Sequence, residues 1–192
     1  MLLVTAAYMG PRPKYPLANT NIPVGVCEFL QKEGPRRMDI RKLAHEVQPE
    51  IIAFRRDLHQ HPEASLQEFR TTDRIAEELD KMGVPYRRLD PTGIIAEIEG
   101  KAPGKRVALR GDIDALSITE KTGLPFASVN DGFMHACGHD THTAMLLGAV
   151  KVLNGLRDSF SGSVRFIFQP AEEIGKGAKL AIKQGALEDV DS

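Results

Sequence analysis

The sequence has almost no excess of charge, because 25 Lys and Arg residues stand against 26 Asp and Glu residues and leave a formal net charge of −1. It therefore lacks the strongly basic surface that binds a nucleic-acid backbone. No stretch approaches the roughly 18 consecutive apolar residues of a membrane span. Only two cysteines are present, Cys27 and Cys137, and they lie too far apart to suggest a disulfide scaffold. Nucleic-acid, membrane and disulfide-scaffold functions are therefore not expected.

The N-terminal region differs in composition from the rest of the chain. Residues 1–37 hold five of the twelve prolines and no sustained apolar period, which predicts an irregular, disordered leader. They also lack the basic start and apolar length of a secretory signal, so a cytoplasmic location is expected. Residues 38–192 are periodic and, at about 150 residues per domain, have room for one domain. The composition, 42% hydrophobic and 27% charged, is that of a globular protein.

Apolar spacing predicts the elements of the second region. Residues 40–58 follow a helical period, in which Pro49 predicts a kink or a restart. Ser65 and Glu68 match a capping box, which predicts a helix that opens there and stops at Gly83. Further helices are expected over 141–156 and 176–185, and strands over 85–89, 93–98, 106–109 and 164–168. This alternation predicts an α/β layered fold, with ligands bound at the strand ends.

Two aspartates follow the strand predicted at 106–109. Asp112 and Asp114 alternate along an extended segment, so both carboxylates can project to the same side. Aspartates that cap a turn or a helix are a common alternative, and this pair by itself does not distinguish the two.

A denser cluster lies further along the chain. Its potential metal ligands are His135, Cys137, His139 and His142. Imidazole and thiolate bind borderline-soft divalent metals, and Gly138 lets the backbone bend between its two neighbours. Buried, hydrogen-bonded side chains at a helix start are the structural alternative. Because four potential ligands lie together, we favour a metal site, although a Cys137 nucleophile activated by His139 or His142 stays open.

Two glutamates follow the most strand-like segment, residues 164–168. On extended backbone, neighbouring side chains point in different directions, so Glu172 and Glu173 suit different tasks. One can bind a metal while the other takes a proton as general base. Solvated charges at a helix start are the alternative. Together with the cysteine and histidine cluster, the pair favours a dinuclear hydrolase.

Four ordered segments resemble the amidohydrolase branch of the aminoacylase and carboxypeptidase family of dinuclear metallopeptidases. They are RRDLHQHPE (55–63), LRGDIDAL (109–116), MHACGHD (134–140) and FQPAEE (168–173). That branch includes hippurate hydrolases, N-acyl-amino-acid hydrolases, indole-acetyl-amino-acid hydrolases and N-acetyl-diaminopimelate deacetylases. The resemblance covers residues 38–192 and implies a three-layer α/β/α metallopeptidase-like catalytic domain.

The resemblance also implies a role for each matching residue. The implied metal ligands are Cys137, His139 and Glu173. Glu172 matches the general acid/base, and Asp114 matches an aspartate that orients the metal centre without binding the ion. Asp112 stands where other branches carry a histidine ligand, so its role stays open.

The implied cofactors are two divalent ions (Zn, Mn, Co or Ni), which would activate a water for attack on the amide bond of an N-acyl amino acid. Glu172 would take the proton of that water and return it to the leaving amine. The alternatives are an N-acetyl-diaminopimelate deacetylase or dipeptidase substrate, and a non-catalytic metal-binding fragment or scaffold.

The family pattern contains parts that this sequence does not reach. Two further histidine ligands, a lid domain and the closing part of the catalytic domain would follow residue 192. We therefore expect the N-terminal half of an enzyme that is inactive alone and whose full-length parent is a homodimer.

Overall fold

The computed structural model describes residues 39–192, and the leader predicted at residues 1–37 lies outside the described part. The helices are α1 (Ile40–Gln60), α2 (Phe69–Met82), α3 (His139–Gly155) and α4 (Gly177–Lys183), with a short 3-10 helix at Arg157–Ser159. The strands are β1 (Tyr86–Arg88), β2 (Ile94–Glu99), β3 (Arg106–Asp112) and β4 (Ser163–Gln169). The predicted elements are therefore present, with ends shifted by a few residues. None of the described helices is long and apolar enough to cross a membrane.

Strand β4 lies inside a mixed four-stranded sheet with the order β1-β2-β4-β3. It pairs with β2 in antiparallel and with β3 in parallel orientation, and Asp112 stands opposite Gln169 in the register. Nearly all residues of β4 are buried, as expected for a strand that is covered on both faces. Because β3 and β4 run parallel, the segments that follow them leave the sheet at the same edge.

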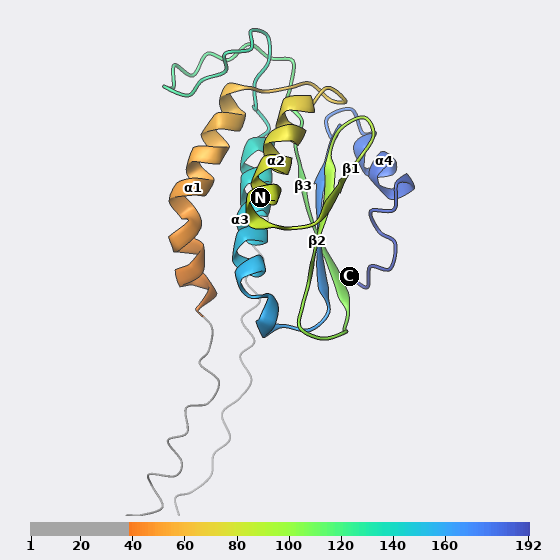
Figure 1. Ribbon diagram of the computed structural model, residues 1–192. Coiled ribbons are helices and arrows are strands. Elements are labelled where there is room, and N and C mark those ends of the chain that lie inside the picture. Colours follow the sequence, from red (N-terminus) through yellow and green to blue (C-terminus); the bar gives the residue numbers. More distant parts are fainter. Residues whose placement is uncertain (1–38) are drawn as a thin grey trace, which may run out of the picture. The chain divides into compact units, whose positions relative to one another are not determined.

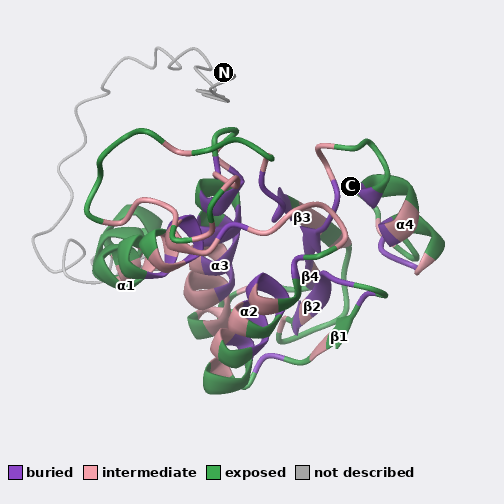
Figure 2. Cartoon of the chain, turned by 90° about the horizontal axis from the view of Figure 1, so that it is seen from above, coloured by how far each residue is buried: buried purple, intermediate pink, exposed green. Residues whose placement is uncertain are grey.

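Helices cover both faces of the sheet, which gives the predicted three-layer α/β/α arrangement (Figure 1). Helices α2 and α3 lie on one face, with α1 packed beside α3, and α4 lies on the other face. Phe166 and Phe168 of β4 belong to the larger core under α1 to α3, whereas Ile167 joins a smaller core with Ala181 of α4. Seen from above, the buried residues concentrate between α2, α3 and the sheet (Figure 2).

Helix α1 runs without interruption through Pro49, so the predicted restart of this helix is wrong. Proline removes one backbone N–H and usually breaks a helix interior. Here Pro49 lies on the exposed side of α1, where water can bond the carbonyl that loses its partner. The following turns are held by Phe54 and Leu58, which are buried in the larger core.

The capping box predicted at Ser65 and Glu68 is also wrong. Helix α2 has no side-chain cap from Glu68, and the Ser65 hydroxyl is bonded elsewhere in the chain. The side chain of Glu63 accepts hydrogen bonds from the first N–H groups of the helix, those of Arg70 at 3.0 Å and Thr71 at 2.7 Å. Glu63 thereby frees the two predicted capping residues for the centre described below.

Candidate metal centre

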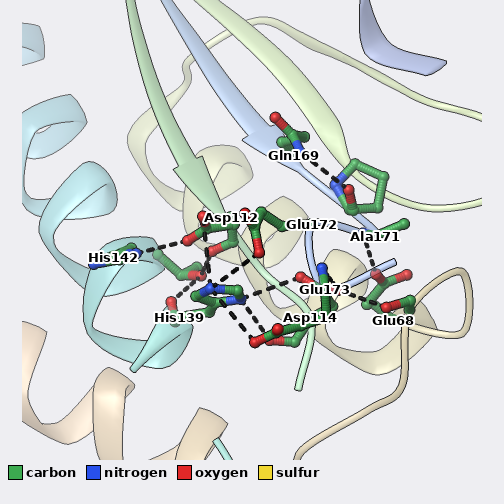
Figure 3. A network of polar contacts seen from close by, with 12 residues as sticks. Glu68, Asp112, Asp114, His139, His142, Gln169, Ala171, Glu172 and Glu173 are labelled. Carbon is green, nitrogen blue, oxygen red and sulfur yellow. Dashed lines mark hydrogen bonds and ion pairs between the residues drawn. The ribbon is translucent and has the colours of Figure 1, made fainter. Parts of the chain in front are cut away.

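The ends of β3 and β4 deliver four carboxylates to one edge of the sheet (Figure 3). Asp112 is the last residue of β3, and Asp114 follows it. Glu172 and Glu173 lie in a turn after β4, where Ala171 has a left-handed φ of 53°. The expectation that the two glutamates diverge assumed extended backbone and is therefore wrong, because the turn brings both side chains toward the same histidine.

That histidine is His139, the first residue of α3. Its Nδ1 lies 3.0 Å from the backbone oxygen of Asp114 and 3.2 Å from the carboxylate of the same residue. Both partners accept, so Nδ1 donates and Nε2 is left for another partner. Nε2 lies 3.7 Å from Asp112 and 3.8 Å from both Glu172 and Glu173. These separations are too long for hydrogen bonds.

The donors around His139 fit a divalent metal ion. Cys137, His139 and Glu173 each offer a ligand atom, and these atoms all lie within 4.8 Å of one another. In a tetrahedral site with bonds of about 2.0–2.3 Å, ligand atoms stand about 3.3–3.8 Å apart. Oε1 of Glu173 is buried and has no hydrogen-bond partner among the described residues, a deficit that a cation would satisfy. The structure thus brings the three predicted ligands together.

The charge distribution favours a cation at this edge. Burial alone would lower the pKa of His139, but its hydrogen bond to Asp114 and the charge of Asp112 outweigh burial and raise the pKa. Burial would raise the pKa of Asp114, but hydrogen bonds from His139, Ser65 and two backbone N–H groups outweigh it and lower the pKa to about 2. Asp114 therefore remains an anionic anchor for the imidazole.

The environment of Cys137 disfavours a thiol nucleophile. Desolvation and the negative charges of Glu173, Glu172 and Asp112 all raise the pKa of this thiol. Nucleophilic cysteines instead have a lowered pKa, produced by a nearby positive charge or a helix N-terminus. At Cys137, which lies just before α3, the influence of the carboxylates prevails. A divalent cation would neutralise these carboxylates and hold the thiolate, so a metal ligand is favoured over a nucleophile.

Asp112, whose role could not be assigned from the sequence, already has a partner at each of its carboxylate oxygens. Oδ2 lies 2.9 Å from Nη1 of Arg110, and Oδ1 lies 2.6 Å from Nδ1 of His142. Asp112, His139 and His142 form a second group of potential ligand atoms, but the Arg110 guanidinium opposes another cation there. His135 belongs to neither group of potential ligand atoms. It is buried without hydrogen-bond partners among the described residues, and burial lowers its pKa to about 4.

Two further buried carboxylates lie next to residues of this region and were not predicted from the sequence. Glu68 is fully buried and accepts hydrogen bonds from the Ala171 N–H at 2.8 Å and the Thr92 hydroxyl at 2.6 Å. Its burial outweighs these bonds and raises the pKa of Glu68. Asp140, in the first turn of α3, is buried and lies 2.7 Å from Nδ1 of His59. Both carboxylates find partners far away in the sequence, so no local pattern marks them.

Known proteins share both the sequence and the fold of the described region. The family model "Peptidase family M20/M25/M40" matches residues 108–192. The chain is 50% identical over 147 residues to the N-acetyl-L-cysteine deacetylase of Bacillus subtilis, which covers 76% of this chain and 35% of that protein. It is 46% identical over 155 residues to the N-acyl-L-amino acid amidohydrolase of Geobacillus stearothermophilus, covering 80% of this chain and 42% of that protein.

A solved structure agrees with these relatives. The YXEP protein of Bacillus subtilis, described as a dinuclear metal binding peptidase from the M20 family, is 47% identical with a TM-score of 0.73. The match covers 78% of this chain and 42% of that one. The chain thus spans about 35–42% of the length of these relatives. The family match over residues 108–192, the sequence identity and the fold all agree with the resemblance of the four motifs to this peptidase family.

Proposed function

We propose that this chain carries the metal-binding edge of a hydrolase that cleaves the amide bond of N-acyl amino acids. The observation that carries the proposal is the buried Oε1 of Glu173, which lacks a hydrogen-bond partner among the described residues and faces Nε2 of His139 at 3.8 Å. Cys137 completes this set of potential ligands. A carboxylate left without a partner beside a thiol and an imidazole is accounted for by a divalent cation.

The bound ions would polarise the amide carbonyl and lower the pKa of a water molecule. Zn, Mn, Co and Ni all accept this donor set, and the description of the YXEP protein as dinuclear supports two ions. Asp114 fixes the His139 ring through Nδ1, which keeps Nε2 aimed at the carboxylates. The Asp114 carboxylate, ionised at neutral pH, therefore orients one ligand without supplying another.

The exposure of the two glutamates supports different tasks for them. The Glu173 side chain is 16% exposed and that of Glu172 is 42% exposed. A ligand is best held in the buried position, whereas a general base must reach both water and substrate. Glu172 accordingly accepts a proton from the attacking water and delivers it to the leaving nitrogen.

The names of the relatives support the substrate class. A deacetylase of N-acetyl-L-cysteine and an amidohydrolase of N-acyl-L-amino acids both release an amino acid from an acyl amide. An N-acetyl-diaminopimelate deacetylase or dipeptidase substrate is the alternative, since "Thermostable carboxypeptidase 1" of Saccharolobus solfataricus is also 48% identical. A cytoplasmic location and a homodimer remain predictions from the sequence and the family resemblance.

Variants of Glu172 and Glu173 test the proposal. Glu172→Gln should lower kcat by roughly 10²–10⁴-fold and leave bound metal unchanged, because the amide keeps the shape but cannot take a proton. Glu173→Gln should lower metal affinity, and excess metal should recover part of the activity. Metal content is measured on this chain, and turnover of N-acetyl amino acids on a chimera that adds the remaining length of the Geobacillus relative.

Three outcomes would contradict the assignment. Loss of metal in Glu172→Gln, with metal retained and kcat abolished in Glu173→Gln, would reverse the two roles. Activity that persists in a metal-free chimera and is lost on alkylation would favour the Cys137 nucleophile. A chimera that binds metal but hydrolyses no acyl amide would favour a non-catalytic scaffold.

A further inference from the structure

The turn that carries the two glutamates has a backbone conformation that needs support. Ala171, directly before Glu172, has a φ of 53°, a left-handed conformation that non-glycine residues adopt only when surrounding contacts hold it. The N–H of Ala171 must find a partner, because the residue is fully buried. Whatever group accepts this bond also fixes the direction in which the following side chains leave the backbone.

Glu68 supplies that acceptor from the start of α2. Its Oε1 accepts the Ala171 N–H at 2.8 Å (Figure 3), and its Oε2 accepts the Thr92 hydroxyl at 2.6 Å. Glu68 is fully buried and forms no ion pair with a described residue. Burial of a carboxylate without a cation is unfavourable, so global stability alone gives no reason for an acid at this position.

A second buried carboxylate holds the other end of the same turn. Oδ2 of Asp114 accepts the backbone N–H of Glu173 at 3.0 Å, while its other oxygen contacts His139. Glu172 thus lies between one residue fixed by Glu68 and another fixed by Asp114. The two anchors come from different elements, so together they set both the position and the twist of the turn.

We propose that Glu68 is a positioning residue, which holds left-handed Ala171 and thereby aims Glu172 and Glu173 at His139. The inference rests on the proposed function where it concerns metal binding, but the ordering of the turn is a property of the chain alone. An acceptor at Oε1 is the essential feature, so glutamine should replace glutamate. Its amide oxygen can accept from Ala171, and its amide N–H can donate to the Thr92 hydroxyl.

Paired variants of the chain test this role. Glu68→Met keeps the side-chain length but removes the acceptor of the Ala171 N–H, and Glu68→Gln keeps an acceptor. Thr92→Val removes the hydroxyl that bonds the Glu68 carboxylate and leaves the bond to Ala171 in place. Glu63→Met is the matched control, because Glu63 also accepts two backbone N–H groups nearby, from Arg70 and Thr71, which start α2.

Two readouts are taken for every variant. Amide hydrogen exchange of residues 171–173 is measured in the metal-free chain, and Co²⁺ affinity is measured from the thiolate-to-cobalt charge-transfer band. Glu68→Met should speed exchange at Ala171 by about tenfold or more and weaken Co²⁺ binding by about 10- to 100-fold. Thr92→Val should change both in the same direction but less, and Glu68→Gln should remain near wild type. Glu63→Met should change both quantities less than Glu68→Met, because it loosens the start of α2 but leaves the acceptor of the Ala171 N–H in place.

The outcomes separate this inference from the proposed function. Unchanged exchange at Ala171 in Glu68→Met, or in Thr92→Val if the methionine variant does not fold, would overturn the inference. Faster exchange with unchanged Co²⁺ affinity would overturn the positioning role. A wild-type chain that binds no Co²⁺ would overturn the proposed metal site, and exchange alone would then decide whether Glu68 orders the turn.

Discussion

Asp114 links three parts of the centre through one side chain. Its carboxylate accepts hydrogen bonds from the Ser65 hydroxyl at 2.6 Å and the Glu173 N–H at 3.0 Å, and it lies 3.2 Å from Nδ1 of His139. Because these bonds favour the anion, the pKa of Asp114 falls from 3.8 to about 2 despite full burial. The hydrogen bonds of Asp114 therefore stabilise the folded state only while its carboxyl group is ionised.

The sign of this contribution predicts a pH dependence. The folded pKa lies below the unfolded one, so the stabilisation is present above about pH 4 and is lost as pH falls through about 2. The shift corresponds to about 2 kcal/mol, of which about 1 kcal/mol is lost between about pH 5 and pH 3. We expect the free energy of unfolding of the metal-free wild type to approach that of Asp114→Asn over this interval in urea titrations.

His139 does not complicate this comparison. Its pKa is raised above 6.5, so it is protonated in both the folded and the unfolded state below about pH 5 and adds no slope there. Parallel pH profiles for wild type and Asp114→Asn would show that the Asp114 hydrogen bonds do not favour the anion.

The chemical roles of single residues were easier to predict than the tertiary contacts that hold those residues in place. Cys137 and His139 stand out as potential ligands by residue type, whereas only the family resemblance distinguished Glu173 from Glu172. Glu68 was assigned instead to a local capping box, since its true partner Ala171 lies 103 residues away. Support for a site is a tertiary contact, and a sequence pattern read over a few residues contains no information about it.

At the scale of elements, the apolar period located helices and strands because it reports burial directly. The run Ser163–Gln169 became the buried inner strand β4, and the period after residue 40 became α1. The prediction at Pro49 was wrong because it considered only the local loss of one backbone hydrogen bond. Helix α1 is held by packing that involves Phe54 and Leu58. The divergence of the two glutamates was also mispredicted, since the end of β4 gives way to a turn.

Helix α4 begins against that turn, and this contact can be tested. A Cβ placed on Gly177 would lie 1.5 Å from the backbone oxygen of Pro170, a clash that no side-chain rotation relieves. Gly177→Ala should therefore displace the turn, lower stability by about 1–3 kcal/mol or more and weaken metal binding. Urea unfolding and Co²⁺ titration measure the two effects.

Gly148 in α3 is the matched control for this substitution. Its added Cβ would meet Ile51 at 3.4 Å, an ordinary contact, and alanine is favoured over glycine inside a helix by about 1 kcal/mol. Gly148→Ala should be neutral or stabilising and should leave metal affinity unchanged. A Gly177→Ala chain as stable as the wild type, with equal affinity, would show that α4 does not constrain the glutamates.

At the scale of the whole described region, the centre lies where three separate segments meet. Cys137 lies just before α3 and His139 is its first residue, whereas Asp114 follows β3 and Glu173 follows β4. A metal ion bound by Cys137, His139 and Glu173 would therefore join elements that are distant in sequence, and its binding free energy would add to that of folding. Binding of the metal should therefore raise global stability.

This coupling gives a measurable expectation for the intact chain. At a free metal concentration of about 100 times Kd, the free energy of unfolding should rise by about 2.7 kcal/mol, or roughly 5–11 °C in Tm at about 2–4 °C per kcal/mol. We expect weak binding of Zn²⁺, Mn²⁺, Co²⁺ or Ni²⁺, with fewer than two ions per chain. Among residues 39–192, Cys137, His139 and Glu173 form the only group of potential metal ligands in which no member is paired with an arginine. The double variant Cys137→Ser, His139→Ala should show no shift. Two ions per chain retained after dialysis would contradict this expectation, since they would require ligands beyond this set.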